Sequence, residues 1–92
     1  MFDLAEKKVL VTGATGGIGE PLAKSFLESG AEIVITGTTK DRLLALQKKI
    51  GNQCKIFRCD LSNNDSVNGL IDFLNDLGGI DILVNNAGKT DD

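Results

Sequence analysis

Short apolar runs alternate with amphipathic stretches along the whole chain. Four runs are rich in β-branched and other apolar residues and predict strands, at 8–12, 32–36, 55–59 and 80–84. The three stretches between them carry apolar residues three or four positions apart and predict helices, at about 17–29, 41–50 and 64–76. Strands therefore alternate with helices throughout, and no linker, repeat or low-complexity segment interrupts them.

This alternation predicts an α/β fold whose strands are parallel and joined by right-handed crossovers. The apolar runs 33–35 and 82–84 indicate strands that are covered on both faces. Gly30 is expected to stop the first helix, and Asp41 is expected to be the N-cap of the second. The length of residues 1–92 fits one small domain.

Composition limits the class of protein. The chain has 92 residues, 41% of them hydrophobic, and a net charge of -3, which together indicate a small folded domain. Its ten basic residues are scattered, so neither nucleic acid nor a membrane surface is expected as a partner. No run is long enough to span a membrane, and residues 1–6 do not resemble a signal peptide, so a cytoplasmic location is expected.

Missing residue types exclude several chemistries. The chain has no His, Tyr or Trp, which excludes a Ser-His-Asp triad, a histidine metal site and a tyrosine acid or base within it. Cys54 and Cys59 match no zinc or redox spacing and are expected to be reduced thiols in or beside a strand. We therefore expect neither a catalytic residue nor a metal site in these 92 residues.

The glycine-rich segment 12–19, Thr-Gly-Ala-Thr-Gly-Gly-Ile-Gly, joins the first predicted strand to the first helix. Glycines let a backbone approach a phosphate closely, and a helix N-terminus supplies N–H donors and partial positive charge. A purely structural turn is the alternative, but the position at the first strand–helix junction favours dinucleotide binding. A P-loop is excluded because no Gly-Lys-Ser or Gly-Lys-Thr follows.

Three motifs at successive strand ends resemble the short-chain dehydrogenase/reductase family: Thr-Gly-x-x-x-Gly-x-Gly at 12–19, Asp60-Leu61, and Asn-Asn-Ala-Gly at 85–88. The resemblance covers nearly the whole chain. It implies the N-terminal part of a doubly wound, Rossmann-like three-layer domain, with a parallel sheet of four strands in the order 3-2-1-4. The fourth strand is then expected to have an unpaired edge.

The resemblance also implies roles for individual residues. The pyrophosphate would lie over the turn, adenine against the pair after the third strand, and the nicotinamide ribose against the motif after the fourth. The implied cofactor-binding residues are Gly13, Thr15, Gly16, Gly17, Ile18, Gly19, Thr38, Asp60, Leu61, Asn86, Ala87 and Gly88. Two have structural alternatives: Asn86 as a tie between strands, and Asp60 as a helix cap or turn former.

Cofactor preference depends on the end of the second strand, where a carboxylate would bind the ribose hydroxyls of NAD and repel a 2′-phosphate. Gly37 stands at the position where NAD-preferring family members carry an acid. Thr38 and Thr39 offer hydroxyls, and Lys40 and Arg42 offer positive charge. The sequence therefore favours NADP as the cofactor.

Within the family, the segments 36–39 and 80–90 are most similar to 3-oxoacyl-(acyl-carrier-protein) reductases of fatty-acid synthesis. The resemblance implies a longer, homo-oligomeric parent enzyme whose catalytic Ser, Tyr and Lys lie outside these residues. It also implies a substrate linked to acyl carrier protein. Two alternatives stay open: a family reductase with another carbonyl or alcohol substrate, and a non-catalytic nucleotide-binding module. Alone, residues 1–92 are expected to be inactive and to bind NADPH weakly.

Overall fold

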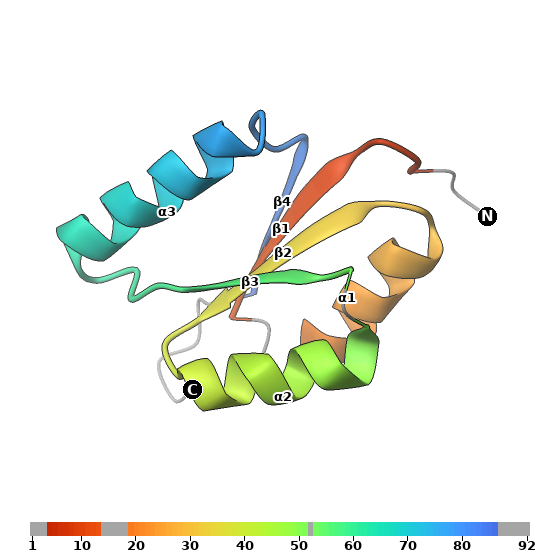
Figure 1. Cartoon of the computed structure of the whole chain (residues 1–92), viewed down its shortest axis with the longest axis horizontal. Helices are drawn as coiled ribbons and strands as arrows, with labels where there is room; N and C mark the ends of the chain where they lie inside the picture. Colours follow the sequence, from red (N-terminus) through yellow and green to blue (C-terminus); the bar gives the residue numbers. More distant parts are fainter. Residues whose placement is uncertain (1–3, 14–18, 52, 87–92) are drawn as a thin grey trace.

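The computed structural model describes residues 4–13, 19–51 and 53–86 (Figure 1). The strands and helices alternate along the chain as expected. They are β1 (Lys8–Thr12), α1 (Gly19–Glu28), β2 (Glu32–Gly37), α2 (Lys40–Ile50), β3 (Lys55–Arg58), α3 (Asn64–Asp76) and β4 (Ile82–Asn85). All neighbouring strands are parallel, and the sheet order β3-β2-β1-β4 confirms the prediction.

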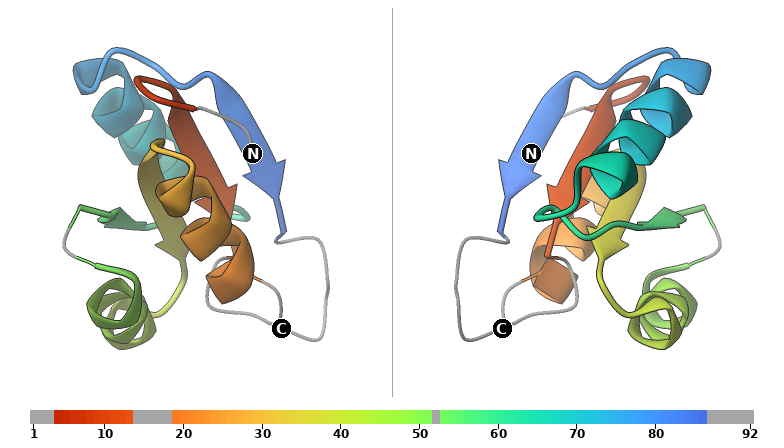
Figure 2. Two further views of the ribbon diagram at one scale, coloured as in Figure 1. Left: turned by 90° about the vertical axis from the view of Figure 1, so that its right-hand side faces the viewer. Right: turned by 90° about the vertical axis from the view of Figure 1, so that its left-hand side faces the viewer.

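Helices cover both faces of the sheet, which confirms the three layers. α1 and α2 lie on one face and α3 lies on the other (Figures 1 and 2). Because successive strand side chains point to opposite faces, β1 and β2 contribute to two cores. Val9, Val11, Ile33 and Ile35 pack with α1 and α2 residues, whereas Leu10 and Val34 pack with α3 residues. The predicted burial of 33–35 on both faces is therefore confirmed.

The equivalent expectation for residues 82–84 is wrong. Among the described residues β4 pairs only with β1, so it is the edge strand that the sequence predicted. Leu83 lies in register with Leu10 on the α3 face, yet it is 58% exposed, while Ile82 and Val84 are half-buried. No described helix reaches over β4 on that face (Figure 2). The apolar run 82–84 predicts burial on both faces, but no described element covers the α3 face of β4.

The ends of three strands differ from the sequence pattern by one or two residues. β4 begins at Ile82 rather than 80, because its register with β1 starts at the pair Val9–Ile82. Asp81 lies just before it and exchanges two hydrogen bonds with the backbone of Lys8, at 2.8 and 2.9 Å. At the other edge of the sheet, β3 ends at Arg58 rather than at residue 59. Its neighbour β2 ends at Gly37, one residue beyond the predicted end at 36.

The helix boundaries give one confirmation and one correction. Gly30 has φ +95° and its N–H donates to Leu27 O at 3.0 Å, so it ends α1 as predicted. Asp41 is not the N-cap of α2, because Thr39 occupies that position and Asp41 lies in the first helical turn. The expected start of the first helix, at about residue 17, falls outside the described residues.

Both cysteines are free and buried beside β3, as the sequence predicted. Cys54 precedes the strand and Cys59 follows it, and each fills a different core. Burial raises the pKa of the Cys54 thiol to about 11. The thiol is therefore protonated at neutral pH, which makes it a poor nucleophile and suits a packing role.

Candidate functional site

The carboxyl ends of the four parallel strands meet at one edge of the sheet. Four predicted site residues lie there: Gly13, Thr38, Asp60 and Asn86 each follow a different strand by one or two positions. The chain leaves β1 toward β2 on one side, while β4 lies on the other side of β1. This arrangement is a topological switch point, where open α/β sheets bind ligands beyond the carboxyl ends of their strands.

A hydrogen-bond network joins the ends of β1 and β4 at this switch point. The Asn86 side-chain Nδ2 donates to Gly13 O at 3.1 Å, and the Asn86 backbone N–H lies 3.2 Å from both the carbonyl and the hydroxyl oxygen of Thr12. The Thr12 hydroxyl, on a buried residue, donates to Asn85 Oδ1 at 2.9 Å. Asn86 is thus a structural tie between strands in this protein, and its contact with a cofactor stays a prediction.

Gly13 begins the glycine-rich turn with φ +63°, in the left-handed region that a glycine enters without steric cost. The backbone can therefore turn sharply at the end of β1. Gly19, the first residue of α1, is buried. The other predicted turn residues, Thr15, Gly16, Gly17 and Ile18, lie outside the described residues, as do Ala87 and Gly88.

Asp60 forms a tight turn after β3. Its Oδ1 accepts hydrogen bonds from the Ser62 hydroxyl at 2.6 Å and from the Ser62 N–H at 3.0 Å. The cap of α3 is instead Asn63, whose Oδ1 accepts from the Ser66 N–H at 2.9 Å. Of the two structural roles expected for Asp60, it is therefore the turn former and not the helix cap. Its contact with a cofactor stays a prediction. Leu61 beside it is 46% exposed.

The Asp60 carboxylate is ionised at neutral pH. The hydroxyl of Ser62, then the Ser62 N–H, lower the pKa of Asp60 below its ordinary value of 3.8. Burial opposes them with a smaller effect, and the Arg58 charge contributes the smallest lowering. Oδ2 makes no hydrogen bond within the described parts of the chain, so it can accept one from a ligand. Such an acceptor suits the amino group of an adenine ring.

The end of β2 carries no acid. Gly37 is the last strand residue, and exposed Thr38 and Thr39 follow. The first acid after them in sequence, Asp41, lies inside the first turn of α2. The Thr38 carbonyl accepts a hydrogen bond from Arg58 Nε at 2.9 Å. The sequence pattern predicts Lys40 and Arg42 as the positive charges here, and Arg58 is a third that it does not predict. The signal for Arg58 was the strand order, since β3 beside β2 brings its last residue to this turn.

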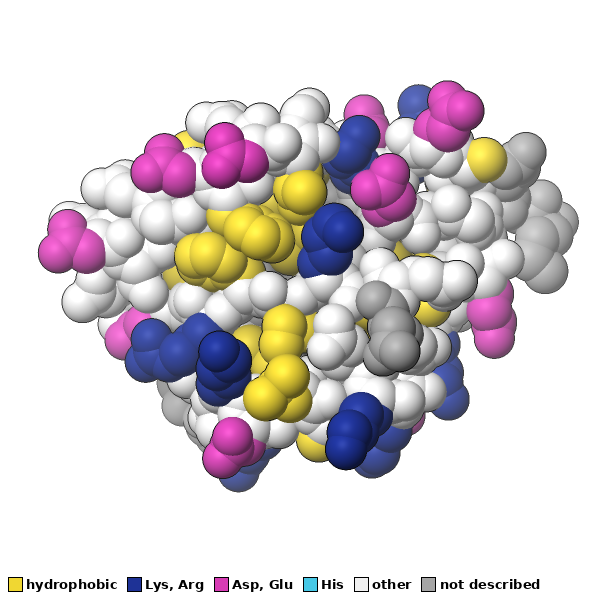
Figure 3. Space-filling view, in the orientation of Figure 1, with side chains coloured by type: hydrophobic (Ala, Val, Ile, Leu, Met, Phe, Trp, Pro, Cys, Tyr) yellow, Lys and Arg dark blue, Asp and Glu magenta, His cyan; other side chains and the backbone are white. Residues whose placement is uncertain are grey.

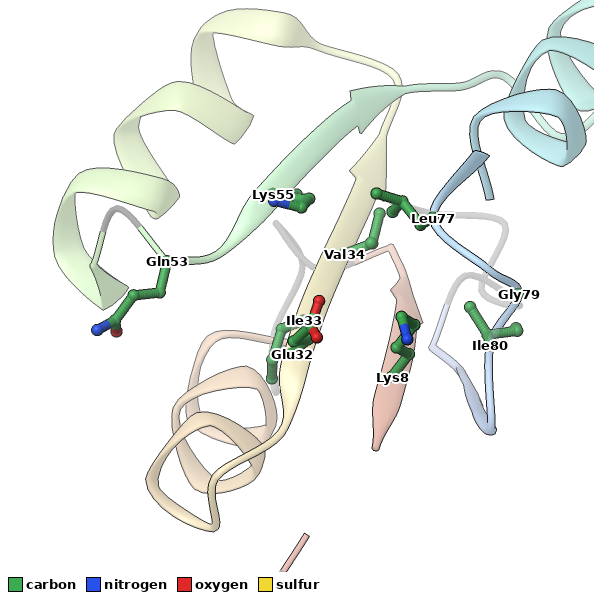
Figure 4. A pocket seen from close by; sticks show the side chains of 9 residues that line it. All are labelled: Lys8, Glu32, Ile33, Val34, Gln53, Lys55, Leu77, Gly79 and Ile80. Carbon is green, nitrogen blue, oxygen red and sulfur yellow. The ribbon is translucent and has the colours of Figure 1, made fainter. Parts of the chain in front are cut away.

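A hollow on the α3 face lies far from this edge (Figure 4). Its lining comes from the first residues of β1, β2 and β3, including Lys8, Glu32 and Lys55, and from Leu77 and Ile80 after α3. Figure 3 shows one group of hydrophobic side chains between α3 and β3 and a second group over α2. Because the amino ends of the strands line it, the hollow is at the opposite end of the sheet from the candidate site.

The described part of the chain contains no helix that is long and apolar enough to cross a membrane.

Comparison with known proteins agrees with the motifs. Residues 7–92 match the sequence model of the short chain dehydrogenase family. Nodulation protein G of a Rhizobium species is 46% identical over 93 residues, which cover 100% of this chain and 38% of that protein. Glucose 1-dehydrogenase of Gluconobacter oxydans is 43% identical over 89 residues, covering 91% and 34%. The chain thus spans well under half the length of these relatives.

Solved structures of similar proteins have the same fold. The 3-ketoacyl-(acyl-carrier-protein) reductase from Brucella melitensis in complex with NADH superposes with a TM-score of 0.79 at 33% identity, covering 87% of this chain and 33% of that one. The Pseudomonas aeruginosa RhlG complex with NADP superposes with a TM-score of 0.86 at 34% identity, covering 96% and 37%. Motifs, sheet order and sequence similarity agree, and the chain belongs to the short-chain dehydrogenase/reductase family.

Proposed function

We propose that residues 1–92 are the dinucleotide-binding part of an NADPH-dependent reductase. The observation that carries this proposal is the junction of β1 and β4, where Asn86 Nδ2 holds Gly13 O at 3.1 Å at the switch point of a parallel sheet. The tie fixes the start of the glycine-rich turn against the end of β4. A fixed backbone at the start of the first strand–helix turn supports a pyrophosphate site there, because the phosphate must be met by backbone N–H groups.

In this proposal each part of the cofactor lies at a different strand end. The pyrophosphate would lie on the turn from Gly13 to Gly19, and the adenine amino group would donate to Asp60 Oδ2 with Leu61 beside the ring. The nicotinamide ribose would lie at Asn86, Ala87 and Gly88. Solved relatives hold NADH in one case and NADP in another, which supports a nicotinamide dinucleotide.

NADP is the cofactor we propose, because the turn after β2 would accept a 2′-phosphate. Gly37 has no side chain to occupy the space, and Thr38 and Thr39 supply hydroxyl donors. A carboxylate here would repel the phosphate, and none follows β2 before the first turn of α2. The positive charges of Arg58, Lys40 and Arg42 favour a doubly charged phosphate.

For the parent protein we propose reduction of a 3-oxoacyl group linked to acyl carrier protein, as in fatty-acid synthesis. The bound nicotinamide would supply the hydride, and residues 1–92 would bind and orient it without a catalytic side chain of their own. The name of the Brucella relative supports this substrate class, whereas the name of the Gluconobacter relative supports a sugar. We also propose that the parent protein is cytoplasmic and forms a homo-oligomer.

Two measurements on the intact protein that contains this chain test the proposal. Titration calorimetry should give a lower dissociation constant for NADPH than for NADH, and tighter binding of NADH would contradict the NADP assignment. Oxidation of NADPH should then be faster with a 3-oxoacyl thioester than NADP reduction is with glucose. The opposite order would favour the sugar dehydrogenase, and binding without any turnover would favour a non-catalytic module.

A further inference from the structure

Arg58 is the last residue of β3, but its side chain contacts the turn that follows β2. The two strands are paired with Gly37 opposite Arg58, so the arginine lies beside the point where β2 ends. Its Nε donates to the Thr38 carbonyl oxygen at 2.9 Å. The Cys59 N–H, one residue on, donates to Gly37 O at 2.9 Å and fixes the backbone that carries it. The guanidinium is therefore held over the β2–α2 turn.

The rest of the guanidinium is unused. Arg58 is exposed, and its two terminal nitrogens make no hydrogen bond to any residue that the structure describes. No carboxylate forms an ion pair with it in the described parts of the chain, where the one pair is Lys49 with Glu20 at 3.8 Å. Asp60 is close enough to interact with the Arg58 charge, but its Oδ1 is engaged by Ser62. The two terminal nitrogens of Arg58 thus present free donors to a ligand.

Guanidinium groups with two free nitrogens bind phosphate through parallel, charge-assisted hydrogen bonds. We propose that Arg58 binds the 2′-phosphate of NADP and is a determinant of cofactor preference in this protein. The inference rests on the proposed function, because it assumes that the adenosine ribose lies at the β2–α2 turn. The bond to Thr38 O orients the guanidinium before the cofactor arrives, so little side-chain freedom remains to be lost on binding.

The test uses the intact protein and two probes that differ only in the phosphate in question: adenosine 2′,5′-bisphosphate and adenosine 5′-monophosphate. Dissociation constants are measured by calorimetry for the wild type, Arg58→Gln and Arg58→Lys. Lys55→Gln is the matched control, because it removes the same charge from the exposed first residue of the same strand. Thermal unfolding of each variant is followed in parallel.

Arg58→Gln should weaken binding of the bisphosphate about ten- to a hundredfold, the range expected when hydrogen bonds to a charged group are lost. Binding of the monophosphate should stay unchanged in that variant, and Lys55→Gln should change neither constant. Arg58→Lys should give an intermediate loss, since it keeps the charge but not the two-pronged geometry. If Arg58→Gln does not fold, the ratio of the two constants in Arg58→Lys decides the question.

An equal loss for both probes would overturn the inference, because Arg58 would then only support the turn, and the proposed function would stand. Unchanged constants for both probes in Arg58→Gln would overturn it in the same way. A wild-type protein that binds neither probe would overturn the inference and the proposed function together.

Discussion

Asp60, a candidate site residue, is oriented by hydrogen bonds from its neighbour Ser62. Two hydrogen bonds from Ser62 hold one carboxylate oxygen and leave the other available. The same bonds lower the pKa of Asp60 below 3.8, so its charge stabilises the folded chain above that pH. This stability is lost as the pH falls through the lowered pKa, because the unfolded chain, in which Asp60 has its ordinary pKa, binds the proton more tightly than the folded chain does.

Ser62→Ala should therefore raise the pKa of Asp60 toward 3.8, since it removes the hydroxyl that lowers this pKa most. An NMR titration of the Asp60 carboxyl carbon in the intact protein measures the change. Ser29→Ala is the control, because it removes a serine hydroxyl that bonds to Ser25 O at the end of α1 and not to Asp60. A pKa that is the same in wild type and Ser62→Ala would show that the Ser62 hydroxyl does not act on Asp60.

At the scale of elements, the N-termini of α2 and α3 differ although their cap residues have nearly the same backbone. Thr39 has φ −113° and ψ 111°, and Asn63 has φ −113° and ψ 118°. Asn63 accepts a hydrogen bond from Ser66 N–H, whereas Thr39 makes no side-chain cap bond. The beginning of α3 is therefore stabilised by its own sequence, whereas α2 begins beside the proposed phosphate position with no hydrogen bond from its cap side chain in the described part of the chain.

Asn63→Ala should lower the free energy of unfolding by about 1 kcal/mol, the usual cost of a lost N-cap. Thr39→Ala should lower it by less than about 0.5 kcal/mol, because no cap bond is present to lose. Urea unfolding of the two variants and the wild type gives both values. A larger loss for Thr39→Ala than for Asn63→Ala would mean that the Thr39 hydroxyl does cap α2 in solution.

On the scale of the whole molecule, the described chain leaves apolar surface uncovered. Leu83 on the edge strand is 58% exposed, and Ile71 on α3 is 47% exposed. An exposed sheet edge with apolar side chains is a template for pairing with another chain. A domain of this size also buries too little surface to be more than marginally stable.

Residues 1–92 prepared alone should therefore self-associate, which size-exclusion chromatography with light scattering measures. Leu83→Lys in the same peptide should reduce the association, because a charge at an edge strand opposes pairing. The peptide should show no reductase activity and should bind NADPH more weakly than the intact protein does. A monomeric peptide with tight NADPH binding, or with measurable turnover, would contradict this account.

Local pattern predicted most of the architecture, and the exceptions have physical causes. The strand 8–12 and the helix 64–76 begin and end where periodicity placed them. The ends of these two elements were predictable because they depend on residues that are neighbours in the sequence. The strand predicted at 80–84 begins two residues later, because pairing with β1 decides where a ladder starts. Asp41 has a good capping side chain, but the helix begins before it.

The sequence by itself determined the alternating elements, the order of the motifs and the absence of a tyrosine, since each is a property of neighbouring residues or of composition. Only the tertiary structure decided that Arg58 lies against Thr38, 20 positions away, and that Asn86 ties to Gly13 across 73. These contacts depend on which strands are neighbours and in what register. Periodicity shows that a strand is buried, but it does not show which strand lies beside it.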